Sequence, residues 1–228
     1  MLSNYLKIAL RNLFKSKGYS FIIISSLALG LACFILIQLY VQDERRYDRF
    51  HEKADQIYRL VEEGSVGGNR IRTAFTPAPW APALADDFPE IVQAVRIKTP
   101  NSRWLISYEE VNYWEKGFFF ADASIFEVFD FPFVQGNPAT ALAEPNTVVL
   151  TEAAVEKYFG DEDPMGKMLT GDNLLELRVT GVIRNVPRNA HFHFDFLASF
   201  VTLETNQTWY GDLSSFQQQG LNHIVYTR

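Results

Sequence analysis

Residues Ser20 to Val41, SFIIISSLALGLACFILIQLYV, form a stretch without a charged side chain. At about 1.5 Å per residue, a helix of this length extends roughly 33 Å, enough to cross a hydrocarbon core of about 30 Å. A short basic segment precedes this stretch, and a long acidic segment follows it. The pattern predicts one transmembrane helix, residues 20–41, which anchors a large domain formed by residues 42–228.

The charges on the two sides of this stretch predict its orientation. Residues 1–19 carry four basic side chains and no acidic one, whereas the rest of the chain carries 17 basic and 27 acidic side chains. Basic residues beside a span stay on the cytoplasmic side. We therefore expect a cytoplasmic N-terminus and a large domain on the outer side of the membrane. The acidic domain argues against nucleic acid as a partner, because phosphate binding needs a basic surface.

The apolar stretch has two alternative readings, a cleaved signal peptide and a lipoprotein signal. A cleaved signal peptide has an apolar region of about 7–15 residues and a small-residue cleavage site. The present run is longer and leads directly into charged residues from Asp43 onward. Leu31-Ala32-Cys33 resembles a lipidation site, but the apolar run continues for eight residues past Cys33. Because Cys33 is the only cysteine, we expect the domain to fold without a disulfide.

The segment before the span has the pattern of an amphipathic helix. Within residues 2–15, apolar side chains recur with i, i+3, i+4 spacing, and Lys7, Arg11 and Lys15 lie on the other side. Residues 1–19 are therefore expected to form a basic helix on the cytoplasmic lipid surface, with an elbow at Lys17-Gly18. The alternative is a simple extension of the span.

Small residues within the span suggest a surface for helix packing. Ser26 and Gly30 are four residues apart, and so are Ala28 and Ala32. Small side chains at this spacing allow close approach of helices in lipid, although such residues are also common in spans by chance.

The segment after the span is expected to continue the helix as a stalk over Gln42 to Ala54. It contains helix-compatible charge pairs such as Asp43 with Arg46, and it contains no glycine or proline that would act as a hinge. A continuous helix there would be stiff. The residues assigned to this stalk are Asp43, Glu44, Tyr47, Asp48, Phe50 and His51.

The remaining pattern predicts a mixed α+β domain. Strand, helix and strand follow one another over about 45 residues from Ile57, which suggests a small α/β layer. Thr151 is expected to cap a helix that ends at Gly160. The predicted strands are residues 57–61, 92–98, two within 104–117, 147–150, 175–184, 192–200 and 223–226, and the predicted helices are residues 76–88, 122–129 and 151–160.

No nucleotide-binding loop is present, since nothing matches GxxxxGK[ST] or GxGxxG. The strongest candidate for chemistry is the sequence His191-Phe192-His193-Phe194-Asp195. On a strand, His191, His193 and Asp195 would share one face and could hold a metal ion. The alternative is a structural strand that buries Phe192, Phe194 and Phe196. Since no other His or Cys cluster supports a ligand set, we predict no catalytic, cofactor or metal site.

Several longer motifs carry a resemblance to a known family. These motifs are NYLKIALRNLFKSKGYSFI, SLALGLACFILIQLYVQDE, YDRFH with ADQIYRL, FFFADASIFEVFDFPFVQGNP, NTVVLTEAAVEKYFGDEDPMGK and VTGVIRNVPRNAHFHFDFLASF. They resemble bacterial ABC transporter permeases of the MacB/FtsX-like family, and the later ones resemble its periplasmic core domain. The resemblance covers nearly the whole chain.

The resemblance implies a permease of four spans with its periplasmic domain between spans one and two. It divides that domain into a stalk and porter-like part (42–100), an inserted mixed part (101–204) and a return toward the porter-like part (205–228). The implied partners are a cytoplasmic ABC ATPase, a second permease protomer and a periplasmic adaptor. The implied substrates are drugs, peptides or lipoproteins that are already outside the membrane.

The sequence departs from the family pattern because it ends at Arg228, before the last three spans. We therefore expect either a fragment or a truncated product. Two other functions stay open. One is a membrane-anchored sensor or binding domain, which would need an output module. The other is a periplasmic metal-dependent enzyme, which would depend on His191, His193 and Asp195.

Overall fold

The structure is a computed structural model that describes residues 11, 13–99, 103–205, 213–214 and 219–227 of the 228-residue chain. The chain divides into two units, Met1–Tyr47 and Asp48–Arg228, and each is described by itself. We call the second unit the main domain.

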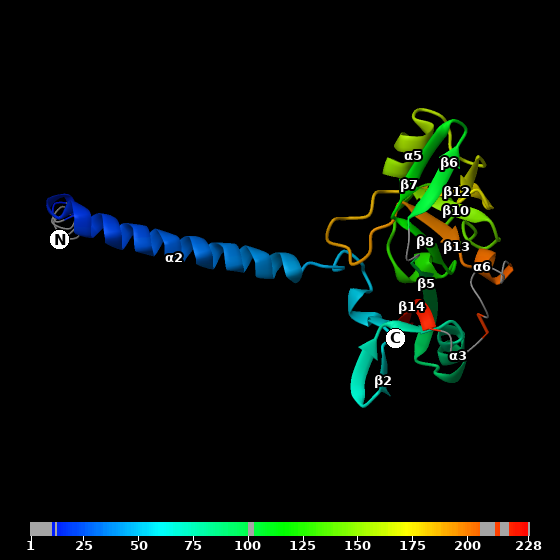
Figure 1. Ribbon diagram of the computed structural model, residues 1–228, viewed down its shortest axis with the longest axis horizontal. Helices are drawn as coiled ribbons and strands as arrows, with labels where there is room; N and C mark the ends of the chain where they lie inside the picture. Colours follow the sequence, from blue (N-terminus) through cyan, green and yellow to red (C-terminus); the bar gives the residue numbers. More distant parts are fainter. Residues whose placement is uncertain (1–10, 12, 100–102, 206–212, 215–218, 228) are drawn as a thin grey trace. The chain divides into compact units, whose positions relative to one another are not determined.

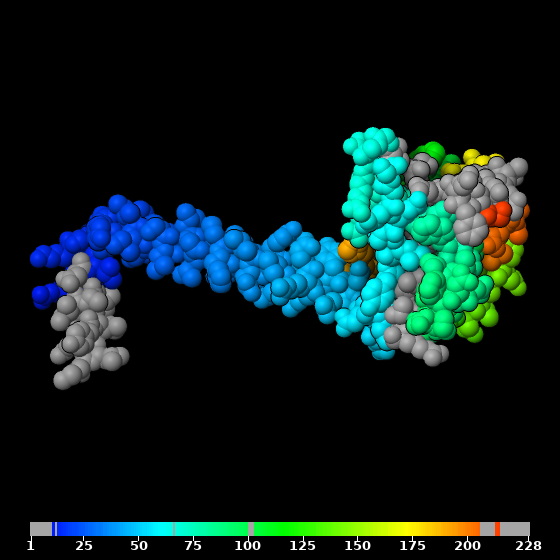
Figure 2. Space-filling model, turned by 90° about the horizontal axis from the view of Figure 1, so that it is seen from below, coloured from blue at the N-terminus to red at the C-terminus, as the bar shows by residue number. Residues whose placement is uncertain are grey.

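The first unit is dominated by helix α2, Lys17–Glu44. At about 1.5 Å per residue this helix is roughly 42 Å long. Its apolar side chains are exposed, for example Phe21 at 73% and Leu27 at 64%. Figure 2 draws this helix in blue. Among the described residues, α2 is the one helix long and apolar enough to cross a membrane. Side chains of this kind need an apolar environment rather than water.

Most of the predicted amphipathic helix, residues 2–15, lies outside the described residues. Residues 11 and 13–15 are helical, and the helix is interrupted at Ser16, close to the predicted elbow at Lys17-Gly18. The side chain of Ser20 donates a hydrogen bond to the Leu13 carbonyl across this interruption, at 3.0 Å.

The predicted stalk helix from Gln42 to Ala54 is wrong. Helix α2 ends at Glu44, turns follow, and the next helical segment is the short 3-10 turn η1, Ala54–Gln56. Asp48 has a φ of 56°, which an α-helix does not allow. Charge pairs within a helix contribute only about 0.2–0.5 kcal/mol each, so contacts of Asp48 with a distant part of the main domain outweigh them.

The main domain is a mixed α+β domain, as predicted (Figure 1). Its helices are α3 Trp80–Asp87, α4 Ile125–Val128, α5 Glu152–Phe159 and α6 Val201–Thr205. Its strands are β1 Ile57–Arg59, β2 Glu62–Val66, β3 Asn69–Thr73, β4 Phe75–Pro77, β5 Ile91–Lys98, β6 Trp104–Tyr108, β7 Val111–Glu115, β8 Phe118–Ala121, β9 Phe133–Gly136, β10 Thr147–Thr151, β11 Met168–Gly171, β12 Leu175–Ile183, β13 Phe196–Ser199 and β14 Gln219–Thr227.

One large sheet runs through the domain in the order β1-β14-β5-β8-β13-β10-β12-β11-β6-β7, with β4 beside β14 and β9 beside β12. Strand β14 lies between β1 and β5 and is antiparallel to both. The late strand β14 therefore completes the layer that β1, α3 and β5 begin. Strands β2 and β3 form a separate hairpin, which projects from the rest of the domain in Figure 1.

Several local predictions are confirmed. Thr151 caps α5, since its hydroxyl oxygen accepts a hydrogen bond from the Ala154 backbone N–H at 3.3 Å. The helix ends at Gly160, whose φ of 58° favours glycine. Strands β6 and β7 pair around a turn at Glu109-Glu110.

The central strands separate two hydrophobic cores. On β13, Phe196 and Ala198 belong to the first core, whereas Leu197 belongs to the second. This alternation follows from the period of two along a strand. The first core also contains Trp104, Phe118, Phe120, Leu150 and Tyr158. The second core also contains Val95, Ile97, Phe129, Phe131 and Phe194.

Candidate functional site

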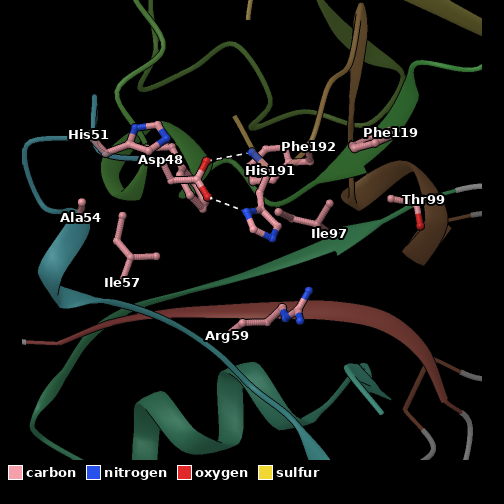
Figure 3. A pocket seen from close by; sticks show the side chains of 11 residues that line it. Asp48, His51, Ala54, Ile57, Arg59, Ile97, Thr99, Phe119, His191 and Phe192 are labelled. Atoms are coloured by element: carbon pink, nitrogen blue, oxygen red, sulfur yellow. Dashed lines mark hydrogen bonds and ion pairs between the residues drawn. The ribbon is translucent and has the colours of Figure 1, made fainter. Parts of the chain in front are cut away.

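The main domain begins with a segment that is bonded to two distant parts of the same domain. We call residues 48–53 the linking segment. The backbone N–H of Asp48 donates to the Asn189 carbonyl at 2.9 Å. The Asp48 carboxylate accepts from the His191 backbone N–H at 2.8 Å and lies 3.1 Å from His191 Nδ1 (Figure 3). The left-handed conformation of Asp48 is one that aspartate tolerates better than most residues, and it turns the chain toward these partners.

His51 anchors the linking segment in the second core. Its side chain is almost completely buried, with the residue 4% exposed. Its ring lies 5.0 Å from that of Phe129 and 5.7 Å from that of Phe131, both edge to face. Nδ1 accepts a hydrogen bond from the Asp130 backbone N–H at 3.0 Å, so this nitrogen carries no proton.

Burial lowers the pKa of His51, because a charged ring would lose its hydration, and this effect outweighs the opposing charges of Asp130 and Asp48. The neutral ring is therefore the form that the folded domain favours. The hydrogen bond at Nδ1 also favours the neutral ring, since protonation of that nitrogen would break the bond.

Two further bonds join the linking segment to the region around α4. The Glu52 backbone N–H donates to the Asp130 carboxylate at 2.7 Å. Lys53 Nζ donates to the Glu127 carbonyl at 2.8 Å. The linking segment is thus attached to residues 127–131 on one side and to residues 189–191 on the other.

The predicted strand 192–200 is shorter than expected, because β13 begins only at Phe196. Asp195 and Phe196 both donate their backbone N–H groups to the Gly117 carbonyl, at 2.8 and 3.0 Å. Since residues 191–195 are not a strand, the period of two does not apply to them.

The structure separates the polar residues of the HFHFD sequence. His191 binds Asp48, whereas the Asp195 carboxylate accepts from the Thr151 hydroxyl at 2.9 Å. His193 is exposed. Among the residues that the structure describes, no group of three or more His, Cys, Asp or Glu side chains is placed to hold a metal ion. The shared face of His191, His193 and Asp195 that we predicted is therefore wrong.

The phenylalanines of the same sequence pack in two different cores. Phe194 is buried in the second core, 5.2 Å from the Phe131 ring, and Phe192 is half-buried beside Phe129. Phe196 is buried in the first core. The predicted burial of Phe194 and Phe196 is confirmed, whereas Phe192, also predicted to be buried, is only half-buried. The separation of Phe194 and Phe196 between two cores was not predicted, and it follows from the turn of the chain at Asp195.

A pocket of about 480 Å³ opens beside the linking segment. Asp48, His51 and His191 line it from one side in Figure 3, and Ala54, Ile57 and Arg59 line it from the other. Sequence reasoning singled out Asp48, His51 and His191 separately but did not place them together. It missed Asp130 and Asn189. The only signal for these two residues was that they lie within the family motifs FFFADASIFEVFDFPFVQGNP and VTGVIRNVPRNAHFHFDFLASF.

Other predicted site residues stay in the first unit. Asp43 and Glu44 are the last two residues of α2, and Tyr47 lies in the turns that follow. Ser26, Ala28, Gly30 and Ala32 lie within α2, where the Ser26 hydroxyl donates to the Ile23 carbonyl at 3.0 Å. Their role in helix packing stays a prediction.

A half-buried ion pair joins β5 to Asp122, which follows β8, and to Glu204 on α6. Arg96 on β5 binds the Asp122 carboxylate with two nitrogens, the shortest distance being 2.8 Å, and its Nη2 lies 2.9 Å from Glu204. Burial acts to lower the pKa of Arg96, but the hydrogen bond and charge of Asp122, together with Glu204, raise it overall. Arg96 therefore stays charged and serves a structural role.

Comparison with known proteins identifies the domain. A domain of a permease protein from Porphyromonas gingivalis is similar in structure, with a TM-score of 0.66, 19% identity, and coverage of 78% of this chain and 75% of that chain. The periplasmic region of MacB from Actinobacillus actinomycetemcomitans has a TM-score of 0.56 and 16% identity, covering 80% of this chain and 77% of that one.

The extracellular domain of the noncanonic ABC-type transporter YknZ from Gram-positive bacteria has a TM-score of 0.53 and 15% identity, covering 75% and 82%. No curated protein sequence matches the chain. At these identities the structural likeness shows the fold alone. The family described as MacB-like periplasmic core domain matches residues 20–225. The chain therefore belongs to the family of MacB-like periplasmic core domains.

Proposed function

We propose that the chain is part of a permease subunit of an ABC exporter, and that it transmits ATPase-driven motion to a periplasmic domain. Family membership and the apolar helix α2 support this proposal. The substrates would be drugs, peptides or lipoproteins that are already in the periplasm or the outer leaflet. The finer parts of the proposal concern topology, partners and the path of motion.

For topology, we propose that α2 crosses the inner membrane once, with the N-terminus in the cytoplasm. The four basic and no acidic side chains of residues 1–19 support this orientation. Reporter fusions at residues 60 and 200 should both give external signals. Cytoplasmic reporting at either position would overturn the topology.

For partners, we propose a separate cytoplasmic ATPase, a second permease protomer and a periplasmic adaptor. The sequence has no phosphate-binding loop of its own. The small side chains of Ser26, Ala28, Gly30 and Ala32 would allow close packing of α2 with another helix in lipid.

The observation that carries the coupling proposal is the attachment of the linking segment. A pull on the chain at residue 47 would reach residues 189–191 through Asp48, and residues 127–131 through His51, Glu52 and Lys53. These hydrogen bonds replace the stiff stalk as the means of coupling. Motion of the helix would then move the domain as a rigid body.

This proposal can be tested in the full-length permease reconstituted with its ATPase. In a Cys33→Ala background, a spin label at Asp161→Cys would report the distance between the main domains of the two protomers with and without ATP. Asp161 is exposed and lies outside the linking segment. We expect Asp48→Ala to lose most of the ATP-dependent change in distance while ATP hydrolysis continues.

Glu144→Ala is a matched control, because it removes an exposed ion pair with Arg178 of 2.6 Å elsewhere in the domain. This variant should keep the full change in distance. If Asp48→Ala also keeps it, the linking segment does not transmit the motion.

A further inference from the structure

The pocket beside the linking segment has the size and lining of a small-molecule site. Its volume of about 480 Å³ falls within the range of roughly 300–1,000 Å³ that is typical of ligand pockets. Much of its lining is apolar and comes from several elements: Ile57 on β1, Ile97 on β5, Phe119 on β8, and Phe129 and Phe192 from loops. Such a lining favours a ligand with an apolar body.

The polar and charged groups that line the pocket differ in whether they already have a partner. The Asp48 carboxylate is occupied by His191, through the backbone N–H and through Nδ1. His51 uses Nδ1 to accept the hydrogen bond from Asp130. The Asp48 carboxylate and His51 Nδ1 therefore already accept hydrogen bonds from groups of the same domain.

Arg59 also lines the pocket, and it differs from Asp48 and His51. It lies on β1 two residues after Ile57, so both side chains leave the strand on the same face, and both line the pocket. Within the described part of the chain, Arg59 forms no ion pair. A guanidinium group is always charged and presents several donors suited to a planar or tetrahedral anion.

We propose that this pocket binds an anionic amphiphile, with its carboxylate, sulfonate or phosphate group at Arg59 and its apolar body against Ile97, Phe119 and Phe192. Residues of the linking segment line the site together with residues of β1 and β5. A bound ligand would therefore contact the linking segment and the sheet at once. The binding proposal does not depend on the coupling proposed above.

Two sources could supply such a ligand: a soluble acid, or an anionic lipid of the surrounding membrane. They share the same chemistry at Arg59, and the composition of the membrane distinguishes them. We therefore place the full chain in nanodiscs of zwitterionic phosphatidylcholine, and in a second set that contains phosphatidylglycerol. If lipid is the natural occupant, phosphatidylglycerol should weaken the apparent affinity for a soluble acid.

The test uses 1-naphthaleneacetate and its uncharged counterpart 1-naphthaleneacetamide, with binding measured by saturation-transfer difference NMR against empty nanodiscs. In phosphatidylcholine discs, the wild type should bind the acid more tightly than the amide. Arg59→Gln should weaken binding of the acid about tenfold, the effect of one charge-assisted hydrogen bond. Binding of the amide should stay unchanged, and Arg59→Lys should recover part of the loss.

Arg72→Gln is a matched control, because Arg72 is an exposed arginine on β3 that does not line the pocket. This variant should bind both compounds as the wild type does. Ala54→Phe and Thr99→Trp place a larger side chain at the pocket without truncating the core, and each should abolish binding of both compounds. An unfolding temperature close to that of the wild type identifies the variants that are folded.

Three results would overturn the proposal. The first is that the wild type binds the acid no more than empty nanodiscs do. The second is that Arg59→Gln and Arg72→Gln have equal effects on binding of the acid. The third is that both folded pocket-filling variants bind as the wild type does, which would place the compound elsewhere.

Discussion

The two cores on opposite faces of the central strands are similar in burial but differ in their neighbours. The first core is built around Trp104, Phe118 and Phe196, and its aromatic rings mostly contact one another. The second core includes Phe129 and Phe131, which also contact His51 of the linking segment. Damage to the first core should therefore affect stability alone. Damage to the second core should affect both stability and the attachment of the linking segment to this core.

The largest effect is expected from Phe118→Ala in the first core. Phe118 is completely buried and stacks on Trp104 with ring centroids 4.4 Å apart. Its truncation should lower the free energy of unfolding by about 4 kcal/mol, since it removes buried surface and leaves a cavity. Denaturant unfolding of the full chain measures this change. Trp114→Ala, at an exposed aromatic residue, should stay within about 0.5 kcal/mol of the wild type.

The second prediction concerns neighbouring residues at the edge of the second core. Phe194 is 2% exposed and packs against Phe131, whereas His193 is exposed. Phe194→Ala should destabilise the domain by about 3 kcal/mol, and His193→Ala by less than about 0.5 kcal/mol. Half-buried Phe192 can shift to fill part of the space, which makes the first effect smaller than that of Phe118→Ala. Equal destabilisation by the two variants would refute the assignment of Phe194 to a core.

Local features of the fold could be predicted from the sequence, because their causes are local. Uncharged residues from Ser20 to Val41 predict an apolar helix, and α2 contains them all. Thr151 and Gly160 predict the ends of α5, because a hydroxyl group satisfies a free N–H and glycine adopts positive φ.

The linking segment could not be predicted in the same way. His191 is 143 residues from Asp48, and Asp130 is 79 residues from His51. Periodicity carries no information about contacts at such separations. Because these distant contacts were not visible in the sequence, the charge pairs from Asp43 onward indicated a helix. Each such pair contributes little to the stability of a helix.

The alternation in the HFHFD sequence indicated that its phenylalanines are buried, but it did not indicate in which core each one lies. Alternation predicted that Phe194 and Phe196 would share a face, and the structure places them in different cores. The missing information was that the chain turns at Asp195, where the Gly117 carbonyl accepts two backbone N–H groups.

Asp48 is the residue at which the contacts of the linking segment can be removed directly. Asp48→Ala removes two contacts with His191 and leaves alanine at a φ of 56°, which it tolerates poorly. We expect a loss of about 1–2 kcal/mol of stability. Asp48→Asn keeps an acceptor oxygen and a side chain that tolerates this conformation, so its loss should be smaller. The order of the two unfolding temperatures checks the argument, and the reverse order would contradict it.

The smallest effect is a dependence of stability on pH that arises from His51. Burial lowers the pKa of His51 in the folded domain, whereas the unfolded chain has the ordinary value of about 6.5. The unfolded state then binds more protons as the pH falls below about 6.5, so stability should decrease in that window and be fully present above it.

His51→Gln keeps an acceptor for the Asp130 N–H but cannot titrate. Unfolding temperatures of the full chain, measured from about pH 5 to about pH 7.5, should therefore fall less steeply toward acid pH in this variant than in the wild type. His193→Gln serves as the matched control, because it removes an exposed histidine that lies close to the same core. That variant should keep the wild-type slope. An unchanged slope in His51→Gln would mean that other groups cause the acid sensitivity. The second core would then still contact the linking segment through His51, but it would not make stability depend on pH.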